Sequence, residues 1–426
     1  MAIGSLKARQ QPTDLDGPRQ RRHRPDYWLL LIATALIVIG LIVLYAISPG
    51  LAIQKQVGDN YFVNKQMIAI ALGIVAFVAM ANIPVNFWRH LQRPLLIAAA
   101  LSAIAVRLFG ERVNGAYRWI QVGGMSFQAA ELIKFALLIW LACFLVERIQ
   151  EGNLGDVKKT LQPLIIAMVI IGLVVGKVQS DFGSTAVMVA MIGSMAFVAG
   201  MPMKRVMMVG AIVAIGGLLL IAGSSYRRDR LMTFMHPEQD CQNAGYQVCQ
   251  ALITVGSGGM FGLGVANSVQ AYGYLPEAAN DSIFAILAEK FGFIGVTALV
   301  ALFVTFFRRL FRIAERAPDD YSRLLVVGIL AWLSTQVLIN VGAMLGLLPL
   351  KGITLPFISY GGTSLVFVLG AVGLVFQISR YTVYRTAAVS SQTGQTTREG
   401  RANESAPHWR RNGRAHNPAV GRRSQA

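Results

Sequence analysis

Charged residues are scarce in this 426-residue chain, where Asp, Glu, Lys and Arg make up 14% against 54% hydrophobic residues. Soluble globular domains carry about 25% charged residues. With a mean hydropathy of +0.53, this shortage excludes a soluble globular protein and also a disordered chain. Because a bilayer-spanning helix needs about 20 predominantly apolar residues, the composition indicates a polytopic membrane protein.

Motifs for the common cofactors are also missing. The chain has no CxxC, no HExxH and no GxxxxGK[ST], and its five histidines are scattered, so we expect no zinc site and no nucleotide or redox cofactor. The glycine-rich stretch 255–265 departs from GxGxxG because Phe261 occupies the last glycine position. We expect these glycines to serve tight turns and close packing rather than phosphate binding.

Acidic residues are few relative to basic ones, with 21 Asp and Glu against 39 Lys and Arg and a net charge of +18. In a soluble protein this excess would indicate a nucleic-acid partner. In a membrane protein, Lys and Arg collect in cytoplasmic loops. Most of them fall in cytoplasmic segments if both termini lie in the cytoplasm, so we predict an N-in, C-in orientation and no nucleic-acid partner.

The apolar runs predict an all-α fold of about ten transmembrane helices. The fifth and sixth flank a polar break at 179–181, so one of them is a candidate broken or re-entrant helix. The predicted spans are 27–48, 66–83, 95–109, 130–146, 161–177, 185–200, 203–223, 283–307, 323–348 and 364–384.

Three regions flank or interrupt the predicted transmembrane domain 27–384. Residues 1–26 form a basic cytoplasmic tail without a cleavable signal peptide. Residues 385–426 are rich in Ser, Thr, Gly and Arg, which predicts a disordered basic cytoplasmic tail suited to anionic lipid or to solubility. A loop of nearly 60 residues, 224–282, lies outside the membrane between helices 7 and 8 and has no obvious helix pattern.

Asp281 is the most suggestive single residue, because it directly precedes a predicted span at the outer interface. One interpretation is a helix cap that complements the helix dipole. The other is a carboxylate at the mouth of a cavity, available as a general base. Glu289 and Lys290 lie about two turns deeper, either as functional intramembrane groups or as a structural pair with another helix.

Three further polar clusters precede or open predicted spans. Residues 351–364 contain Lys351, Ser359, Gly361 and Gly362 before the last span, an arrangement suited to anion binding at a helix N-terminus, although Lys351 could equally snorkel. In a second cluster, Arg118 is followed by Glu131 and Lys134, whose i,i+3 spacing lets them face each other. The third is the polar break that contains Asp181. Together the clusters suit an amphiphile that enters from the outer leaflet.

These motifs resemble the SEDS family (shape, elongation, division and sporulation) of bacterial cell-wall proteins over residues 24–385. The resemblance rests on Gly-Tyr-Gln at 245–247, Asn-Ser-Val-Gln at 267–270, Leu-Pro-Glu-Ala-x-x-Asp at 275–281 and Lys-Gly-Ile-Thr-Leu-Pro-Phe-Ile-Ser-Tyr-Gly-Gly at 351–362. Lys351 and the Arg-Pro-Asp start favour the division branch over the elongation branch. Ala129 and Ser180 replace prolines common in the family, which puts local kinks in doubt.

The resemblance implies a peptidoglycan glycosyltransferase, an inverting enzyme that polymerises lipid II at the outer face of the bacterial cytoplasmic membrane. It implies a class B penicillin-binding protein (a transpeptidase) and other divisome membrane proteins as partners, and a place at the division septum. It carries the family's essential aspartate onto Asp281, as general base or as ligand of a divalent cation, Mg or Mn. The candidate substrate-binding residues are Arg118, Lys134, Glu277, Lys351, Ser359, Gly361 and Gly362, and the candidate supporting polar residues are Glu131, Asp181, Glu289 and Lys290.

Two alternatives from other functional classes remain open. A lipid II flippase would also use many spans with intramembrane charges, although transporters often show inverted repeats and midplane sites, and this chain shows neither. A non-catalytic scaffold would recruit its transpeptidase without chemistry. Cys241 and Cys249 depart from the family pattern; because they share the outer loop, where oxidation is possible, a disulfide between them is a hypothesis.

Overall fold

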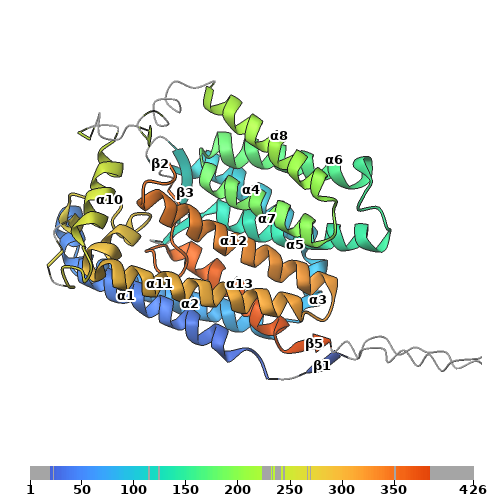
Figure 1. The fold of residues 1–426 in the computed structure, drawn as a ribbon, viewed down its shortest axis with the longest axis horizontal. Helices are drawn as coiled ribbons and strands as arrows, with labels where there is room; N and C mark the ends of the chain where they lie inside the picture. The colour runs from blue at the N-terminus through green and yellow to red at the C-terminus, as the bar shows by residue number, and fades with distance from the viewer. Residues whose placement is uncertain are drawn as a thin grey trace, which may run out of the picture. The chain divides into compact units, whose positions relative to one another are not determined.

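The computed structural model describes residues 20–22, 24–113, 116–122, 125–222, 232, 234–235, 241–242, 245–265, 267–268, 270–349 and 352–383. Most of these residues are helical (Figure 1). The long helices and the segments that join them are α1 (Tyr27–Lys55), α2 (Tyr61–Asn82), α3 (Val85–His90), α4 (Gln92–Phe109), α5 (Ala129–Gln150), η1 (Val157–Leu161), α6 (Gln162–Ile171), η2 (Gly172–Val178), α7 (Phe182–Val198), α8 (Met203–Ala222), α10 (Tyr246–Ser257), η4 (Gln270–Tyr272), α11 (Ile283–Glu315), α12 (Asp320–Met344) and α13 (Gly362–Ile378).

Seven helices of the described part are long and apolar enough to cross a membrane, which makes the chain a polytopic membrane protein. They are α1, α2, α4, α5, the continuous helix Val157–Val178, α11 and α12. Two shorter apolar helices, α7 and α13, and the helix α8 overlap the remaining predicted spans. Every predicted span therefore overlaps a helix of the described part.

The prediction of an all-α fold is wrong in one respect, because residues 111–113, 116–122 and 125–128 form an antiparallel sheet. Strand β3 (Ala116–Val122) pairs with β2 (Glu111–Val113) on one side and with β4 (Met125–Gln128) on the other. The sequence of β3, Ala-Tyr-Arg-Trp-Ile-Gln-Val, is rich in the aromatic and β-branched residues that favour strands. The sheet bridges the end of α4 and the start of α5.

A second, two-stranded sheet joins the two ends of the described chain. Strand β1 (Gln20–Arg22) pairs antiparallel with β5 (Tyr381–Val383), and Gln20 lies opposite Val383. The last predicted span, 364–384, is therefore too long, because α13 ends at Ile378 and the chain then becomes extended. Nearby, the backbone N–H of Asp26 donates to Ser379 Oγ (3.1 Å).

The core of the helical region is built by α5, α7, α12 and α13. Helix α12 packs along α7 and α11, and α13 packs along α2. The contact between α13 and α2 depends on Gly373, where an added Cβ would lie 2.5 Å from the carbonyl oxygen of Phe77. Small residues at helix crossings allow this close approach in membrane proteins.

Helix α11 is broken near its start by Gly292, whose backbone angles (φ 64°, ψ −167°) are not helical. A Cβ at Gly292 would lie 2.3 Å from the amide nitrogen of Gly262, and a Cβ at Gly258 would lie 2.0 Å from the carbonyl oxygen of Ala288. The prediction that the 255–265 glycines serve close packing is confirmed by these contacts. The prediction that 224–282 lacks a helix pattern is wrong, because α10 lies within it.

Figure 1 shows α10, β2 and β3 at one end of the helical region and α3, β1 and β5 at the other. These are called the α10 end and the α3 end below. Chain segments at the α10 end include the turn 277–282 that precedes α11 and the loop 352–361 that precedes α13. This end therefore gathers most of the residues singled out in the sequence.

Candidate active site

Asp281 lies in the turn 277–282, directly before Ser282, which is the N-cap residue of α11. The side chain of Ser282 makes no cap hydrogen bond, and Asp281 lies one residue before the N-cap position. Its Oδ1 atom is buried and has no hydrogen-bond partner among the described residues. A buried carboxylate oxygen without a donor is costly in a folded protein, and such groups are typical of functional sites.

The surroundings of Asp281 raise the pKa of its carboxyl group from 3.8 to about 7. Burial is the largest cause, because it disfavours the charged form, and the nearby carboxylate of Glu277 adds to it. The positive charge of Arg118 and hydrogen bonds from the backbone act in the opposite direction. A carboxyl group with a pKa near neutrality is suited to accept a proton during a reaction.

Asn340 of α12 fixes the backbone on both sides of this carboxylate. Its side-chain nitrogen donates to the carbonyl oxygens of Asp281 (2.8 Å) and Ile353 (2.7 Å). The hydroxyl of Ser359 donates to the carbonyl oxygen of Asn280 (2.6 Å). These bonds join the turn 277–282 to the loop 352–361, so the position of Asp281 depends on both segments.

Arg118 reaches the same place from strand β3. Its Nε donates to the carbonyl oxygen of Gln179 (3.1 Å) and its Nη2 to that of Ser180 (2.5 Å). Gly352 lies between the guanidinium and the carboxylate: a Cβ there would lie 3.3 Å from Nη1 of Arg118 and 3.8 Å from Oδ2 of Asp281. Glycine therefore keeps open the space between a cation and the buried carboxylate.

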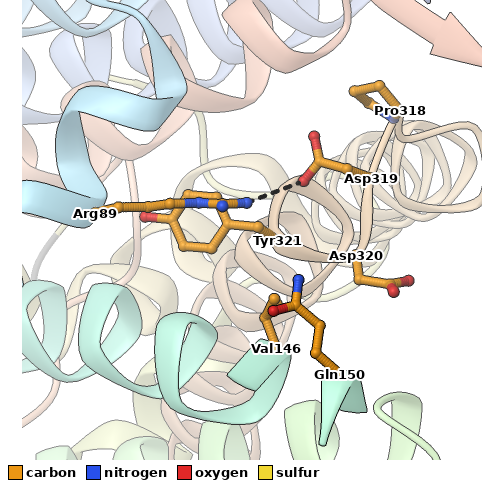
Figure 2. A pocket seen from close by; sticks show the side chains of 7 residues that line it. All are labelled: Arg89, Val146, Gln150, Pro318, Asp319, Asp320 and Tyr321. Atoms are coloured by element: carbon orange, nitrogen blue, oxygen red, sulfur yellow. Dashed lines mark ion pairs between the residues drawn. The ribbon is translucent and has the colours of Figure 1, made fainter. Parts of the chain in front are cut away.

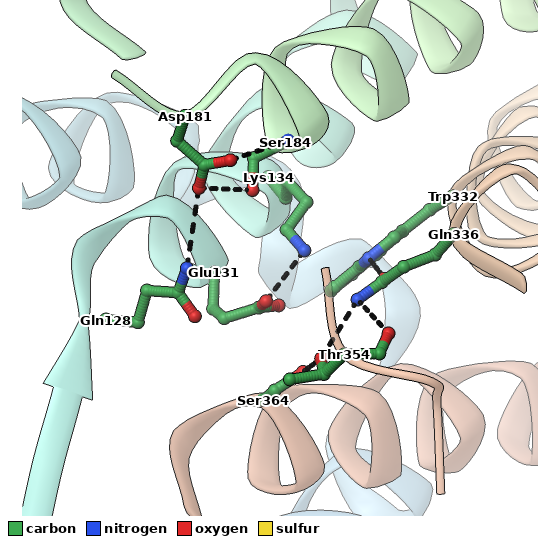
Figure 3. Close-up of polar contacts among 9 residues, drawn as sticks. All are labelled: Gln128, Glu131, Lys134, Asp181, Ser184, Trp332, Gln336, Thr354 and Ser364. Carbon is green, nitrogen blue, oxygen red and sulfur yellow. Dashed lines mark hydrogen bonds and ion pairs between the residues drawn. The ribbon is translucent and has the colours of Figure 1, made fainter. Parts of the chain in front are cut away.

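A second polar cluster lies within the helices (Figure 3). Lys134 Nζ donates to Glu131 Oε1 at 2.7 Å, with side chains only 1% and 2% exposed. This confirms that the two residues face each other along α5. Lys134 Nζ also lies 5.0 Å from the ring centre of Trp332 on α12, a cation–π contact. The other carboxylate oxygen of Glu131 is buried without a partner in the described region.

Asp181 caps α7 beside this pair. Its carboxylate accepts from the backbone N–H of Ser184 (3.0 Å), from the Ser184 hydroxyl (2.8 Å) and from Gln128 Nε2 (3.5 Å). Figure 3 shows Asp181 and Gln128 on one side of the Glu131–Lys134 pair. The polar break at 179–181 is thus both a helix start and part of the cluster.

The loop 352–361 connects the two clusters. Gln336 donates through Nε2 to the carbonyl oxygen (3.3 Å) and the hydroxyl (3.4 Å) of Thr354, and accepts from Trp332 Nε1 (2.8 Å). The Thr354 hydroxyl lies 3.2 Å from that of Ser364 at the start of α13. Gly361 is the N-cap residue of α13, and a Cβ there would lie 3.6 Å from Thr354, so this helix N-terminus lies beside Thr354.

Trp332, Gln336 and Asn340 were not predicted from the sequence. They are spaced four residues apart and therefore share one face of α12, and all three are buried. The two amides on one face of a mostly apolar helix could have been used to predict this, because polar groups inside spans indicate function or specific packing.

Glu289 and Lys290 form hydrogen bonds with the segment of chain that precedes α11. Glu289 accepts from the Ser268 hydroxyl (2.5 Å) and the backbone N–H of Gln270 (3.2 Å). Lys290 Nζ donates to the carbonyl oxygen of Val265 (2.6 Å). These hydrogen bonds hold Val265, Ser268 and Gln270 against α11. A part of Glu289 and Lys290 in the reaction stays a prediction.

Cys241 and Cys249 are joined by a disulfide in the structure. The bond fastens the N-terminal part of α10, where Gln247 Nε2 donates to the Ser282 hydroxyl (3.5 Å) next to Asp281. Intact-mass measurement after thiol labelling, with and without prior reduction, tests the bond in the purified protein. Lys351 lies outside the described residues.

A cavity of about 300 Å³ opens at the α3 end, away from these residues (Figure 2). Arg89 crosses it, 3.7 Å from Asp319 and 4.3 Å from the ring centre of Tyr321. None of the site residues predicted from the sequence lines it. Within the described ranges no three His, Cys, Asp or Glu residues gather as a metal site.

Comparison with known proteins shows to which family this chain belongs. The family model described as "Cell cycle protein", which covers FtsW, RodA and SpoVE, matches residues 27–384. The chain belongs to this family. The resemblance to the SEDS proteins is thereby confirmed over the whole membrane region.

The relatives and solved structures of the FtsW/RodA/SpoVE family cover nearly the whole membrane region. "Probable peptidoglycan glycosyltransferase FtsW" of Saccharophagus degradans is 39% identical over 86% of this chain and 95% of its own length. "Stage V sporulation protein E" of Bacillus subtilis is 36% identical over 85% and 99%. A chain in "Structural coordination of polymerization and crosslinking by a peptidoglycan synthase complex" has a TM-score of 0.69 and 26% identity over 84% and 98%. RodA of Thermus thermophilus gives 0.62 and 26% over 84% and 97%.

Proposed function

We propose that this chain is a peptidoglycan glycosyltransferase that polymerises lipid II into β-1,4 glycan strands during septal wall synthesis. The observation that carries this proposal is the buried carboxylate of Asp281, whose pKa is raised to about 7 and whose Oδ1 has no partner in the described region. The names of its relatives, peptidoglycan glycosyltransferases of the FtsW type, support the reaction class.

Asp281 acts as the general base in this reaction. The acceptor is a sugar 4-hydroxyl, a weak nucleophile, and its oxygen attacks the anomeric carbon of the donor. The carboxylate takes the hydroxyl proton as the new C–O bond forms, a contribution of about 10²–10⁴ in rate. The bond to the lipid diphosphate breaks with its electron pair on the leaving oxygen, and attack from the opposite face inverts the anomeric centre.

The leaving diphosphate needs positive charge. Arg118 supplies one guanidinium next to Asp281, where Gly352 leaves room between them. Lys134 supplies an ammonium in the second cluster, but Glu131 already holds it at 2.7 Å. A diphosphate that binds Lys134 therefore competes with Glu131. Lys351 is the third candidate, on sequence grounds.

A divalent cation is part of the proposal. The unpartnered Oδ1 of Asp281 and the nearby Glu277 carboxylate are oxygen ligands of the kind that Mg²⁺ and Mn²⁺ prefer. With diphosphate oxygens completing its ligands, a bound cation would neutralise the leaving group. Asp281 would then bind the cation instead of acting as the general base, and experiment distinguishes these two roles.

We further infer ten transmembrane helices with both termini in the cytoplasm, so that the α10 end lies outside. A class B penicillin-binding protein is the proposed partner, supported by a fold relative solved within a peptidoglycan synthase complex. Other divisome membrane proteins as partners and a septal location are part of the same proposal, which the FtsW names of the relatives support.

Glycan polymerisation by the purified chain with its transpeptidase tests the function. Labelled lipid II and a divalent cation are supplied, and the products are resolved on a gel. We expect polymer from the natural chain and none from Asp281→Ala or Asp281→Asn. The matched control is Asp59→Asn, because Asp59 is an exposed carboxylate in the short turn between α1 and α2.

Each outcome separates the candidate functions. Polymer that persists in both Asp281 variants removes this residue from the mechanism. A folded complex that makes no polymer, but moves lipid II across vesicle membranes, supports a flippase. A scaffold would neither polymerise nor translocate lipid II, and its Asp281→Ala variant would still support cell division.

A further inference from the structure

The turn 258–263, which follows α10, is fixed to the broken point of α11. The backbone N–H of Phe293 donates to the carbonyl oxygen of Gly259 (2.9 Å), and that of Ile294 donates to the carbonyl oxygen of Met260 (3.2 Å). The close approach of Gly292 to this turn leaves no room for side chains between them. The turn therefore lies level with residues 293–294 of α11.

The position of residues 293–294 relative to a bilayer follows from the other end of α11. Arg309 lies 3.6 Å from Asp26 and over the ring of Trp28, and Arg312 follows in the last turn. Arginine and tryptophan at helix ends mark the membrane interface. Phe293 precedes Arg309 by about 24 Å and Arg312 by about 28 Å along the helix. Because the hydrocarbon is about 30 Å thick, Phe293 lies near its opposite edge.

Helix α1 gives a second estimate of where the bilayer ends on this side. From Trp28 to Gly50 the helix rises about 33 Å. A Cβ at Gly50 would lie 2.1 Å from the ring of Tyr272, so this tyrosine, 48% exposed, lies at the interface of the α10 end. Tyrosine is enriched at that depth in membrane proteins.

Large apolar side chains are exposed at this level. Phe261 is 82% exposed and Met260 58%, beside Phe293 at 63% and Ile294 at 50%. Residues 255–265 contain no charged side chain. The apolar surface of the turn is thus continuous with the apolar, outward-facing surface of the spanning part of α11.

We propose that the turn 258–263 is a membrane anchor that inserts Met260 and Phe261 into the bilayer leaflet at the α10 end. Its occupant is lipid, because the turn continues a surface of α11 at the depth where hydrocarbon ends, and because residues 255–265 carry no charged side chain. Apolar side chains on a segment at the headgroup boundary bind membranes in this way.

The anchor has a consequence for the site. Helix α10 ends next to the turn 258–263, and near its start Gln247 donates to the hydroxyl of Ser282 beside Asp281. Lipid contact at Phe261 therefore holds the segment that touches the Asp281 turn against the membrane surface. This inference depends on the membrane location of the chain and is independent of the proposed chemistry.

The depth of a nitroxide label tests the anchor. Phe261→Cys is made in a Cys143→Ala background that keeps the Cys241–Cys249 bond, then labelled and placed in vesicles of phosphatidylethanolamine and phosphatidylglycerol without partner proteins. Relaxation by oxygen, which is enriched in hydrocarbon, is compared with relaxation by a water-soluble nickel chelate. Phe293→Cys is the lipid reference and Asn60→Cys, exposed in the α1–α2 turn, is the water reference.

We expect the oxygen-to-nickel ratio at position 261 to match that at 293 and to exceed that at 60 several-fold. A ratio at 261 equal to that at 60 overturns the proposal and leaves the surface to a protein partner. Met260→Cys provides a second position in the same turn if Phe261→Cys does not fold.

Discussion

Replacing Asp281 by Asn tests the electrostatic description of the site through stability alone. Because the pKa of the folded carboxyl, about 7, lies above its ordinary value of 3.8, folding favours the protonated form. The stability that this proton contributes is fully present below pH 3.8 and is lost as the pH rises through 7. Asparagine carries no charge to desolvate, so the stability of the Asp281→Asn variant does not fall with rising pH for this reason.

The magnitude follows from the pKa. One pKa unit corresponds to about 1.4 kcal/mol, so ionised Asp281 destabilises the fold at pH 8 by on the order of 4 kcal/mol as an upper bound. Between pH 5 and pH 8 the stability of Asp281→Asn relative to the natural chain is expected to rise by on the order of 3 kcal/mol.

Thermal unfolding in detergent at pH 5 and pH 8 measures the difference. We expect the midpoint of Asp281→Asn to exceed that of the natural chain by several degrees at pH 8 and by much less at pH 5. Asp59→Asn, at an exposed position, is expected to show no such trend. Two results would refute the raised pKa. One is a midpoint difference between Asp281→Asn and the natural chain that is the same at pH 5 and pH 8, and the other is a lower midpoint for the variant at pH 8.

Three further predictions concern the neighbours of Asp281 and the second cluster. Glu277→Gln removes a charge that raises the pKa of Asp281, so the midpoint of the pH–rate profile moves to lower pH; an unchanged or higher midpoint contradicts this. Asn340→Leu leaves the carbonyl oxygens of Asp281 and Ile353 without their donor, at about 1–3 kcal/mol each, so the thermal midpoint and polymerisation both fall. A variant with an unchanged midpoint and unchanged polymerisation would show that Asn340 does not position Asp281. Lys134→Met leaves Glu131 buried without its cation, which lowers the stability by about 3–5 kcal/mol. We expect the added change Glu131→Gln to recover the thermal midpoint but not polymerisation. If the double variant makes polymer, Lys134 does not bind the diphosphate.

The membrane helices were predictable because each coincides with an apolar run. The sheet β2–β3–β4 was not predicted, because its strands are short and lie in a polar segment where the alternation of seven residues competes with turn signals. Helix α13 was predicted too long, because the apolar character of Tyr381–Val383 says nothing of its pairing with β1.

Local spacing predicted the ion pair of Glu131 and Lys134, since i,i+3 neighbours on a helix meet whatever surrounds them. The contacts of Glu289 and Lys290 could not be predicted, because their partners lie in a loop about 20 residues earlier whose course depends on glycine packing against α11. Asn340 was missed for a different reason: its amide bonds two loops separated by about 70 residues, which no local pattern describes.

The pairing of β1 with β5 gives the order of synthesis a role in folding. Strand β1 leaves the ribosome first, but its partner, Tyr381–Val383, follows the last helix of the membrane domain. Strand β1 therefore cannot form this pairing until the last helix of the membrane domain has been made. A chain that stops before residue 381 keeps an open strand edge, the kind of surface on which aggregation and quality control act, so closure of this small sheet marks a completely translated membrane domain.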